Sequence, residues 1–486
     1  MTNLPNDPNM RFAVAPTDIT QMDFFDERKA LGAGLPAEAG TSALFIVSGK
    51  KSSKLKEAVG FFKRKIAWSP WLILFLIIMV AIIGIRPVQN LVTSTIEKKE
   101  ELLSPLGNAK PGYEVFGFAP HWTFDKLHSV NFETLTTMAY FGIEAKADGN
   151  LDVEGRGYEV FMSEKATEVF KKAHRNGTRV VLTITQMDND NIKAIMDDPV
   201  LQESIISQTV EMVRARGIDG VNIDFEYTGN PGEEYREKFT IFSKNLTDRI
   251  HAEIPGSKVT ASVYASAVKD PKMYNIKTLA EATDGIFMMA YDFAVAGSAN
   301  AIPTAPLYGH KEGKYWYDIS TAVDAFLTQM PSNKLILGVP WYGYNYAVEA
   351  PEVKTATTKG YYTYYKKGWR TYSNFVSLRS HAQTYTLVKK DLHAGNEEIS
   401  DFREGFDEYG KVSWKAYLQG GVWRMIFIDD VKSQAYKYDF AKEKNLAGVG
   451  MWALGFDDGP EVWALLKDKF GAKDVADSSV TDREIK

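Results

Sequence analysis

The 486-residue sequence contains no cysteine. This absence excludes a disulfide framework, a thiol nucleophile and cysteine-ligated metals, although it does not identify the compartment in which the protein acts. The chain also lacks an excess of basic charge. Its formal net charge of -5 argues against nucleic acid as the natural partner. Hydrophobic residues make up 45% of the chain, which is enough to bury a substantial core.

One stretch has no charged residue at all. Residues 66–85 read IAWSPWLILFLIIMVAIIGI. A helix of twenty residues spans about 30 Å, the thickness of the hydrocarbon core of a bilayer. The run is too long for the apolar region of a signal peptide and begins far from the N-terminus. We therefore expect a transmembrane helix at 66–85, with a buried core helix as the alternative.

The two flanks of this run differ in charge. Cations gather on the N-terminal side, at Lys50, Lys51, Lys54, Lys56, Lys63, Arg64 and Lys65. On the other side Arg86, Lys98 and Lys99 are balanced by Glu97, Glu100 and Glu101. By the positive-inside rule, residues 1–65 form a cytoplasmic and largely flexible tail, whose protein partner the sequence does not indicate. Residues 86–112 then read as a stalk, and the rest of the chain lies outside the cytoplasm, in the periplasm or at the cell surface.

From Tyr113 onward, short apolar runs alternate with amphipathic stretches of helical period. Eight of the runs read as strands: Val115–Ala119, Thr137–Phe141, Arg179–Ile184, Gly220–Phe225, Lys258–Val263, Gly285–Tyr291, Lys334–Pro340 and Gly448–Trp452. Eight strand–helix units predict an α/β fold, a (β/α)8 TIM barrel over 113–470, followed by a flexible tail at 471–486. A doubly wound sheet would need a glycine-rich loop after the first strand, which the segment FGFAPHW does not supply.

The seventh and eighth predicted strands are unusually far apart in the sequence. Residues 346–446 separate them, although one crossover needs only about 30 residues. This segment is rich in Tyr, Thr, Val and Trp, in a pattern typical of β-strands. We expect a small inserted α+β domain beside the barrel mouth that returns through a helix near Ser433–Lys444.

Three polar residues share one face of the fourth strand. In Asp219–Tyr227 (DGVNIDFEY), side chains alternate, so Asn222, Asp224 and Glu226 point the same way. Polar groups in a barrel lumen are costly unless they serve a site, and barrel sites lie at the C-terminal strand ends, nearest to Glu226. A second carboxyl in a dry pocket raises the pKa of the first, as a general acid requires. A solvated acidic strand or a metal site is the alternative, but no histidine lies near, and we predict no metal and no cofactor.

This block resembles the signature D-G-hydrophobic-D/N-hydrophobic-D-x-E of glycoside hydrolase family 18, with Glu226 in the acid position. Residues 289–292 (MAYD) resemble the M-x-Y-D motif of that family. Residues 337–343 (LGVPWYG) and 448–455 (GVGMWALG) resemble its seventh and eighth strands. The resemblance covers about residues 115–466, and it is closest to the bacterial branch that includes spore-cortex lytic enzymes.

The resemblance implies substrate-assisted retaining hydrolysis of a glycan that contains N-acetylglucosamine. Glu226 would protonate the glycosidic oxygen, Asp224 would hold the acetamido nitrogen and Tyr291 the acetamido oxygen. Asn222 stands where many members have Asp, and it can donate a hydrogen bond to Asp224 but cannot take up charge. The sugar would lie against a further set of residues: Met289, Asp292, Trp452, Tyr342 and Trp122.

Two features bear on the choice of glycan. The third strand, RVVLTITQMD, lacks the S-x-G-G of many chitinases, which weakens an assignment to chitin. A membrane anchor that faces outward would place the domain beside peptidoglycan, which we favour over chitin-type oligosaccharides. Two other functions stay open: a glycan-binding relative without catalytic activity, and a structural component of the cell envelope.

Overall fold

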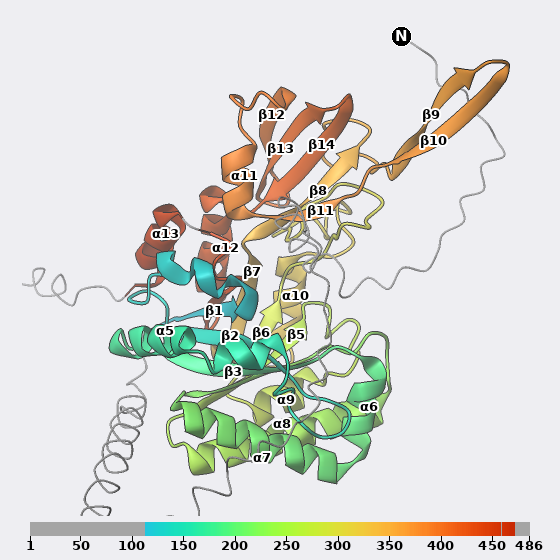
Figure 1. The fold of residues 1–486 in the computed structure, drawn as a ribbon. Coiled ribbons are helices and arrows are strands. Elements are labelled where there is room, and N and C mark those ends of the chain that lie inside the picture. Colours follow the sequence, from blue (N-terminus) through green and yellow to red (C-terminus); the bar gives the residue numbers. More distant parts are fainter. Residues whose placement is uncertain (1–111, 458, 472–486) are drawn as a thin grey trace, which may run out of the picture. The chain divides into compact units, whose positions relative to one another are not determined.

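The computed structural model describes residues 112–457 and 459–471 (Figure 1). Its centre is a closed barrel of eight parallel strands in the spatial order β1-β15-β7-β6-β5-β4-β3-β2. The strands are β1 (Glu114–Pro120), β2 (Thr137–Glu144), β3 (Arg179–Gln186), β4 (Gly220–Phe225), β5 (Lys258–Tyr264), β6 (Gly285–Met289), β7 (Leu335–Pro340) and β15 (Gly448–Trp452). The predicted TIM barrel is confirmed, and each predicted strand lies within a few residues of an observed one.

Helices connect these strands and cover the barrel (Figure 1). They are η2 (His121–Ser129), α4 (Arg156–Phe161), α5 (Glu164–Arg175), α6 (Asn189–Asp197), α7 (Pro199–Arg216), α8 (Glu233–Glu253), α9 (Ile276–Ala282), α10 (Ile319–Phe326), η3 (Ser332–Lys334), α12 (Val431–Glu443) and α13 (Pro460–Phe470). Local sequence sets their ends. Helix α7 is an example. Asp198 precedes its first residue, Pro199, and accepts a hydrogen bond from the N–H of Val200 through its side-chain carboxylate. Gly217 ends the helix in the left-handed region, at φ 60°.

The barrel interior is packed with aromatic rings. Phe287 on β6 lies 5.3 Å from the ring of Phe116 and 4.8 Å from that of Phe118. Space for this ring comes from two glycines on neighbouring strands. A Cβ atom at Gly338 or Gly450 would approach Phe287 to 2.5 or 2.3 Å. This layer fills part of the lumen, so the candidate site is expected at the C-terminal mouth, where sites in such barrels lie.

Between β7 and β15 the chain forms a second sheet, five-stranded and antiparallel, in the order β11-β8-β14-β13-β12. Its strands are β8 (Tyr342–Val348), β11 (His381–Thr384), β12 (Ser400–Asp407), β13 (Val412–Gln419) and β14 (Val422–Ile428). Helix α11 (Tyr385–Asp391) and a hairpin of β9 (Gly360–Lys367) and β10 (Arg370–Ser377) complete the segment. The predicted range 346–446 begins inside β8, and α12 occupies the place of the predicted return helix.

Among the described residues, no helix is both long and apolar enough to cross a membrane. The transmembrane helix predicted at 66–85 lies outside the described residues. So do the predicted cytoplasmic tail, the stalk as far as residue 111, and the C-terminal tail from residue 472.

Candidate active site

The candidate site lies at the C-terminal end of β4. Asn222 and Asp224 are buried on this strand, and Glu226 follows it directly with its side chain half-buried. The backbone N–H of Glu226 donates to the carbonyl of Gln186 at 2.8 Å, which extends the pairing of β4 with β3. Phe225 points the other way and stacks on Phe242 of α8 at 5.6 Å. The period of the strand therefore directs all three polar side chains into the barrel.

The two carboxyl groups of Asp224 and Glu226 hold their protons more tightly than isolated carboxyls do. Burial raises the pKa of Asp224 well above its usual value, and the charge of Glu226 raises it further. Burial also raises the pKa of Glu226, against a hydrogen bond from Tyr264 and the positive charge of Lys272, which lower it. Asp224 Oδ1 is buried and has no hydrogen-bond partner among the described residues. The site thus combines carboxyl groups whose surroundings favour the protonated form with an acceptor oxygen that no described residue occupies.

Asn222 lies deeper in the barrel and is bound by strand β5. Its Nδ2 donates to Ser262 Oγ at 3.0 Å, and its Oδ1 accepts from Thr260 Oγ1 at 2.9 Å. The register of the two strands explains this, because Asn222 stands directly beside Thr260. Its amide therefore donates to Ser262, where the sequence had suggested a bond to Asp224.

Tyr291 and Asp292 follow the end of β6. Burial raises the pKa of Tyr291 well above its usual value, with further contributions from the charges of Asp224 and Glu226, so its hydroxyl stays protonated beside the acidic pair. Asp292 adopts a left-handed conformation at φ 58°, which Asp tolerates better than most residues. Its carboxylate accepts from the hydroxyl of Tyr342 and, at 3.2 Å, from that of Tyr344.

The surroundings of Asp292 set its charge. Although solvent reaches part of the residue, its carboxyl lies among the rings of β8 at the mouth. Loss of hydration raises the pKa of Asp292 to about 6, against the two tyrosine hydrogen bonds. Tyr342 itself is only 1% exposed. The structure therefore places Tyr342 behind Asp292, where it supports that carboxyl and offers almost no surface to a ligand.

Aromatic rings form another part of the mouth. Trp452 ends β15 and packs edge-on against Phe141 at 4.7 Å. Trp122, on η2, lies 6.5 Å from Trp452. Both tryptophans keep accessible surface, as a floor for a sugar ring requires. Met289, the last residue of β6, shares the inward face with Phe287 and is 9% exposed.

The comparison with known protein families agrees with this geometry. The family described as glycosyl hydrolases family 18 matches residues 114–457, which is the barrel with its inserted segment. The chain belongs to this family. It is a glycoside hydrolase, as the motifs of the fourth and sixth strands predict.

The relatives of this glycoside hydrolase fall into several groups. Di-N-acetylchitobiase of Mus musculus is 26% identical over 377 residues, which cover 74% of this chain and 89% of that protein. The cortical fragment-lytic enzyme of Bacillus subtilis is 22% identical over 347 residues, or 69% of this chain and 68% of the relative. The Group IV chitinase of Ostrinia furnacalis, solved with allosamidin, has the same fold, with a TM-score of 0.60 at 19% identity over 74% of this chain and 97% of that structure.

Two residues beside the acid of this glycoside hydrolase were not predicted from the sequence. Tyr264 ends β5 and donates a hydrogen bond to Glu226. Lys272, in the segment after β5, places its Nζ 3.7 Å from the centre of the Tyr264 ring. The position of Tyr264 at a strand end could have revealed it. No signal marks Lys272, because its place depends on the course of the connecting segment.

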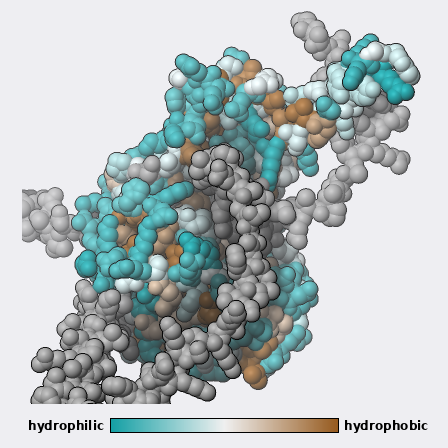
Figure 2. Space-filling view, viewed as in Figure 1, coloured by the Kyte–Doolittle hydropathy of each residue, from teal (hydrophilic) through white to brown (hydrophobic). Residues whose placement is uncertain are grey.

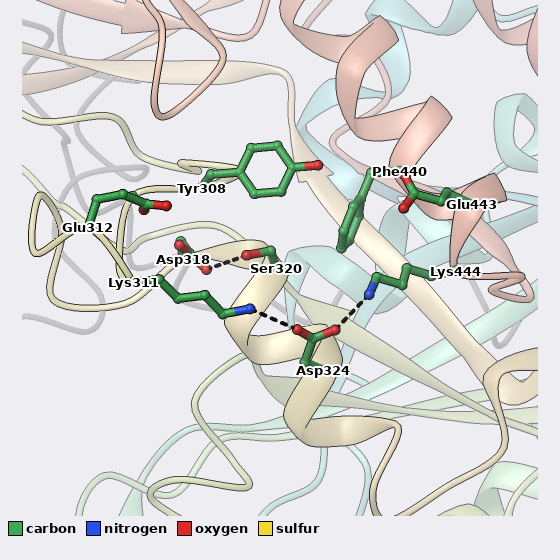
Figure 3. Close-up of a pocket in the computed structure, with 10 residues that line it drawn as sticks. Tyr308, Lys311, Glu312, Asp318, Ser320, Asp324, Phe440, Glu443 and Lys444 are labelled. Atoms are coloured by element: carbon green, nitrogen blue, oxygen red, sulfur yellow. Dashed lines mark hydrogen bonds and ion pairs between the residues drawn. The ribbon is translucent and has the colours of Figure 1, made fainter.

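A hollow of about 140 Å³ lies beside α10 (Figure 3). Its main polar feature is Asp324, whose carboxylate contacts Lys444 at 2.8 Å and Lys311 at 3.3 Å. Asp318 caps α10 through the N–H of Thr321 at 2.7 Å. These groups satisfy one another, and the hollow holds none of the motif residues.

Proposed function

We propose that this glycoside hydrolase cleaves β-1,4 bonds that follow an N-acetylglucosamine unit, by a substrate-assisted retaining mechanism. The observation that carries the proposal is the carboxyl pair at the mouth, buried Asp224 and half-buried Glu226, with the Tyr291 hydroxyl beside it. The relatives support it, since their names describe enzymes that act on chitobiose units, on cortical fragments and on chitin.

In the first step Glu226 gives its proton to the glycosidic oxygen, and the bond from that oxygen to the anomeric carbon breaks. Burial raises the pKa of Glu226, which favours the protonated form that this step requires. The acetamido carbonyl oxygen of the same sugar then bonds to the anomeric carbon and forms a cyclic oxazolinium ion. Asp224 supports the positive ion, because its buried Oδ1 lacks a partner and accepts the acetamido N–H. Tyr291 orients the acetamido oxygen by donating its hydroxyl proton.

In the second step water attacks the anomeric carbon and opens the ring of the intermediate. Glu226, now a carboxylate, takes the proton of this water and returns to its starting state. Two successive displacements at one carbon leave its configuration retained. Trp452 would serve as the floor under the reacting sugar, and Met289, Asp292 and Trp122 would line its sides.

We further propose that peptidoglycan is the natural polymer, because a membrane anchor would place the enzyme beside it. The uncharged run at 66–85, with cations on its N-terminal flank, would hold the enzyme in a bilayer with its barrel outside the cytoplasm. Resistance of the protein to alkaline carbonate extraction, and digestion of the barrel by a protease added to intact cells, would support this arrangement. Release of the protein by carbonate would contradict it.

The test of the activity is an assay of the full chain, purified in a mild detergent, on peptidoglycan sacculi and on chitin oligosaccharides. The wild type should release reducing ends, and Glu226→Gln should lose on the order of 10² or more of this rate. Glu237→Gln, the same chemical change at an exposed position on α8, is the matched control and should keep full activity. Binding without cleavage by the wild type would refute the enzyme and favour a glycan-binding role.

A further inference from the structure

The hairpin of β9 and β10 exposes an unusual number of aromatic rings. It extends beyond the five-stranded sheet of the inserted segment (Figure 1). Trp369 in its turn is 88% exposed and Tyr364 is 70% exposed. The other exposed rings are Tyr361, Tyr362, Tyr365, Tyr372 and Phe375. Soluble proteins rarely leave this much aromatic surface open without a binding partner.

Packing within the hairpin does not bury these rings. Tyr365 stacks on Tyr372 at 5.4 Å on one face, and Tyr362 meets Phe375 at 5.1 Å on the other. Such cross-strand pairs stabilise a two-stranded ribbon. The rings nevertheless stay open to solvent on both faces, and Trp369 contacts only the guanidinium of Arg370, 4.8 Å from its ring, among the ring contacts of the described residues.

The charge of this segment is of one sign. Residues 353–390 contain no Asp or Glu, in a protein whose net charge is -5. Their cations are Lys354, Lys359, Lys366, Lys367, Arg370, Arg379, Lys389 and Lys390. Three of these, Lys366, Lys367 and Arg370, surround the turn at Gly368 and Trp369. A partner that fits this surface carries negative charge, and it also has flat apolar faces that can stack on aromatic rings.

We propose that the hairpin is a second binding site for a glycan that carries carboxylate groups, separate from the cleavage site. This inference rests on the proposed function and narrows its substrate class. Tyrosine and tryptophan rings stack on the apolar faces of sugars, while the cations pair with carboxylates. The eight residues of β9 span about 26 Å at 3.3 Å per residue, a length that suits an extended polymer more than a single sugar.

The surface fits a polymer better than a lipid bilayer. A membrane-inserting element buries a continuous apolar face. In Figure 2 the outer part of the hairpin, at the upper right, is pale and teal, because its exposed rings other than Phe375 belong to tyrosine and tryptophan and its tip carries lysine and arginine. Rings that line both faces of the ribbon also suit contacts along its length more than insertion of its tip.

The test compares two hairpin variants of the full chain in detergent with wild type. One combines Lys366→Gln, Lys367→Gln and Arg370→Gln, and the other combines Trp369→Ser with Tyr364→Ser. The charge control combines Lys172→Gln, Arg175→Gln and Lys467→Gln on helices α5 and α13, which lowers the net charge equally. Each chain is assayed for binding to purified sacculi and to neutral chitin, and for cleavage of sacculi and of short chitin oligosaccharides.

Both hairpin variants should bind sacculi on the order of tenfold more weakly and cleave them more slowly. Their cleavage of short oligosaccharides should equal that of the wild type, which also shows that the barrel is intact. The charge control should behave as wild type. Equal binding of sacculi by all chains would overturn the proposal. Equal losses on chitin and on sacculi by the variant that lacks Lys366, Lys367 and Arg370 would also overturn it, because neutral chitin offers these cations no carboxylate.

Two further outcomes separate this proposal from others. Hairpin-dependent binding of sacculi by a wild type that cleaves no glycan would support the binding site and refute the hydrolase function. Hairpin-dependent association with phosphatidylglycerol-doped micelles, without any effect on sacculi, would overturn the proposal and assign the hairpin to a lipid surface.

Discussion

Asn222→Asp places a third carboxyl in the row that ends at Glu226. At position 222 the side chain is buried, and its neighbours are the hydroxyls of Thr260 and Ser262, which offer hydrogen bonds but no positive charge. Two residues along a strand are about 6.6 Å apart. At an effective dielectric constant of about 20, a charge at this distance from Asp224 is opposed by about 2.5 kcal/mol, or about two pKa units.

The sign of the effect on stability follows from this shift. Because the new carboxyl has a higher pKa in the folded than in the unfolded chain, the folded state binds the extra proton. Stability is therefore kept below about pH 4 and falls as the pH rises. The full loss of about 2.5 kcal/mol is reached once both the new carboxyl at position 222 and that of Asp224 are ionised, with burial adding to the loss. The wild type has no carboxyl at position 222 and lacks this contribution.

Urea unfolding of the full chain at about pH 4 and about pH 8 measures the difference between Asn222→Asp and wild type. Asn345→Asp is the control for burial alone. Asn345 is equally buried but donates to Gln383 at 2.7 Å and to Tyr417 at 2.6 Å. The loss between the two pH values should be larger at position 222. Equal losses at the two positions would refute the repulsion from Asp224.

Three further substitutions test the site through its kinetics, the last two as kcat/KM against pH. Asp224→Asn should lower kcat by on the order of 10², because a neutral amide supports the positive oxazolinium ion less well than the carboxyl group does; a kcat equal to that of the wild type would exclude this role of Asp224. Lys272→Met removes a positive charge that lowers the pKa of Glu226, so the alkaline limb should move to higher pH. A shift to lower pH would contradict this effect of Lys272 on Glu226. Tyr342→Phe removes a hydrogen bond that holds the pKa of Asp292 down at about 6, so any limb set by Asp292 should move upward; a profile identical to wild type would exclude Asp292 from the rate.

The barrel and the acidic row could be predicted because they depend on short-range patterns. Eight apolar runs separated by amphipathic stretches are sufficient to define a barrel. The two-residue period of a strand is sufficient to direct Asp224 and Glu226 into its mouth. The left-handed glycine at position 217, which ends α7, follows in the same way from local chain geometry.

The remaining features depend on contacts between segments far apart in the sequence. Asn222 binds Ser262 because of the register between β4 and β5, which no single strand encodes. Lys272 reaches Tyr264 through the irregular segment that follows β5. Tyr342 lies behind Asp292 because β8 starts the inserted sheet directly after β7. Each of these positions follows from tertiary packing, which local pattern does not determine.

The central claim is that the acetamido group of the substrate acts as the nucleophile beside Glu226. The measurement that tests it most directly is proton NMR of the anomeric signals during cleavage of a chitin oligosaccharide by the full chain. The account predicts that the β-anomer of the new reducing end forms first and mutarotates afterwards, as retention requires. Initial formation of the α-anomer would mean inversion by direct attack of water and would contradict the account.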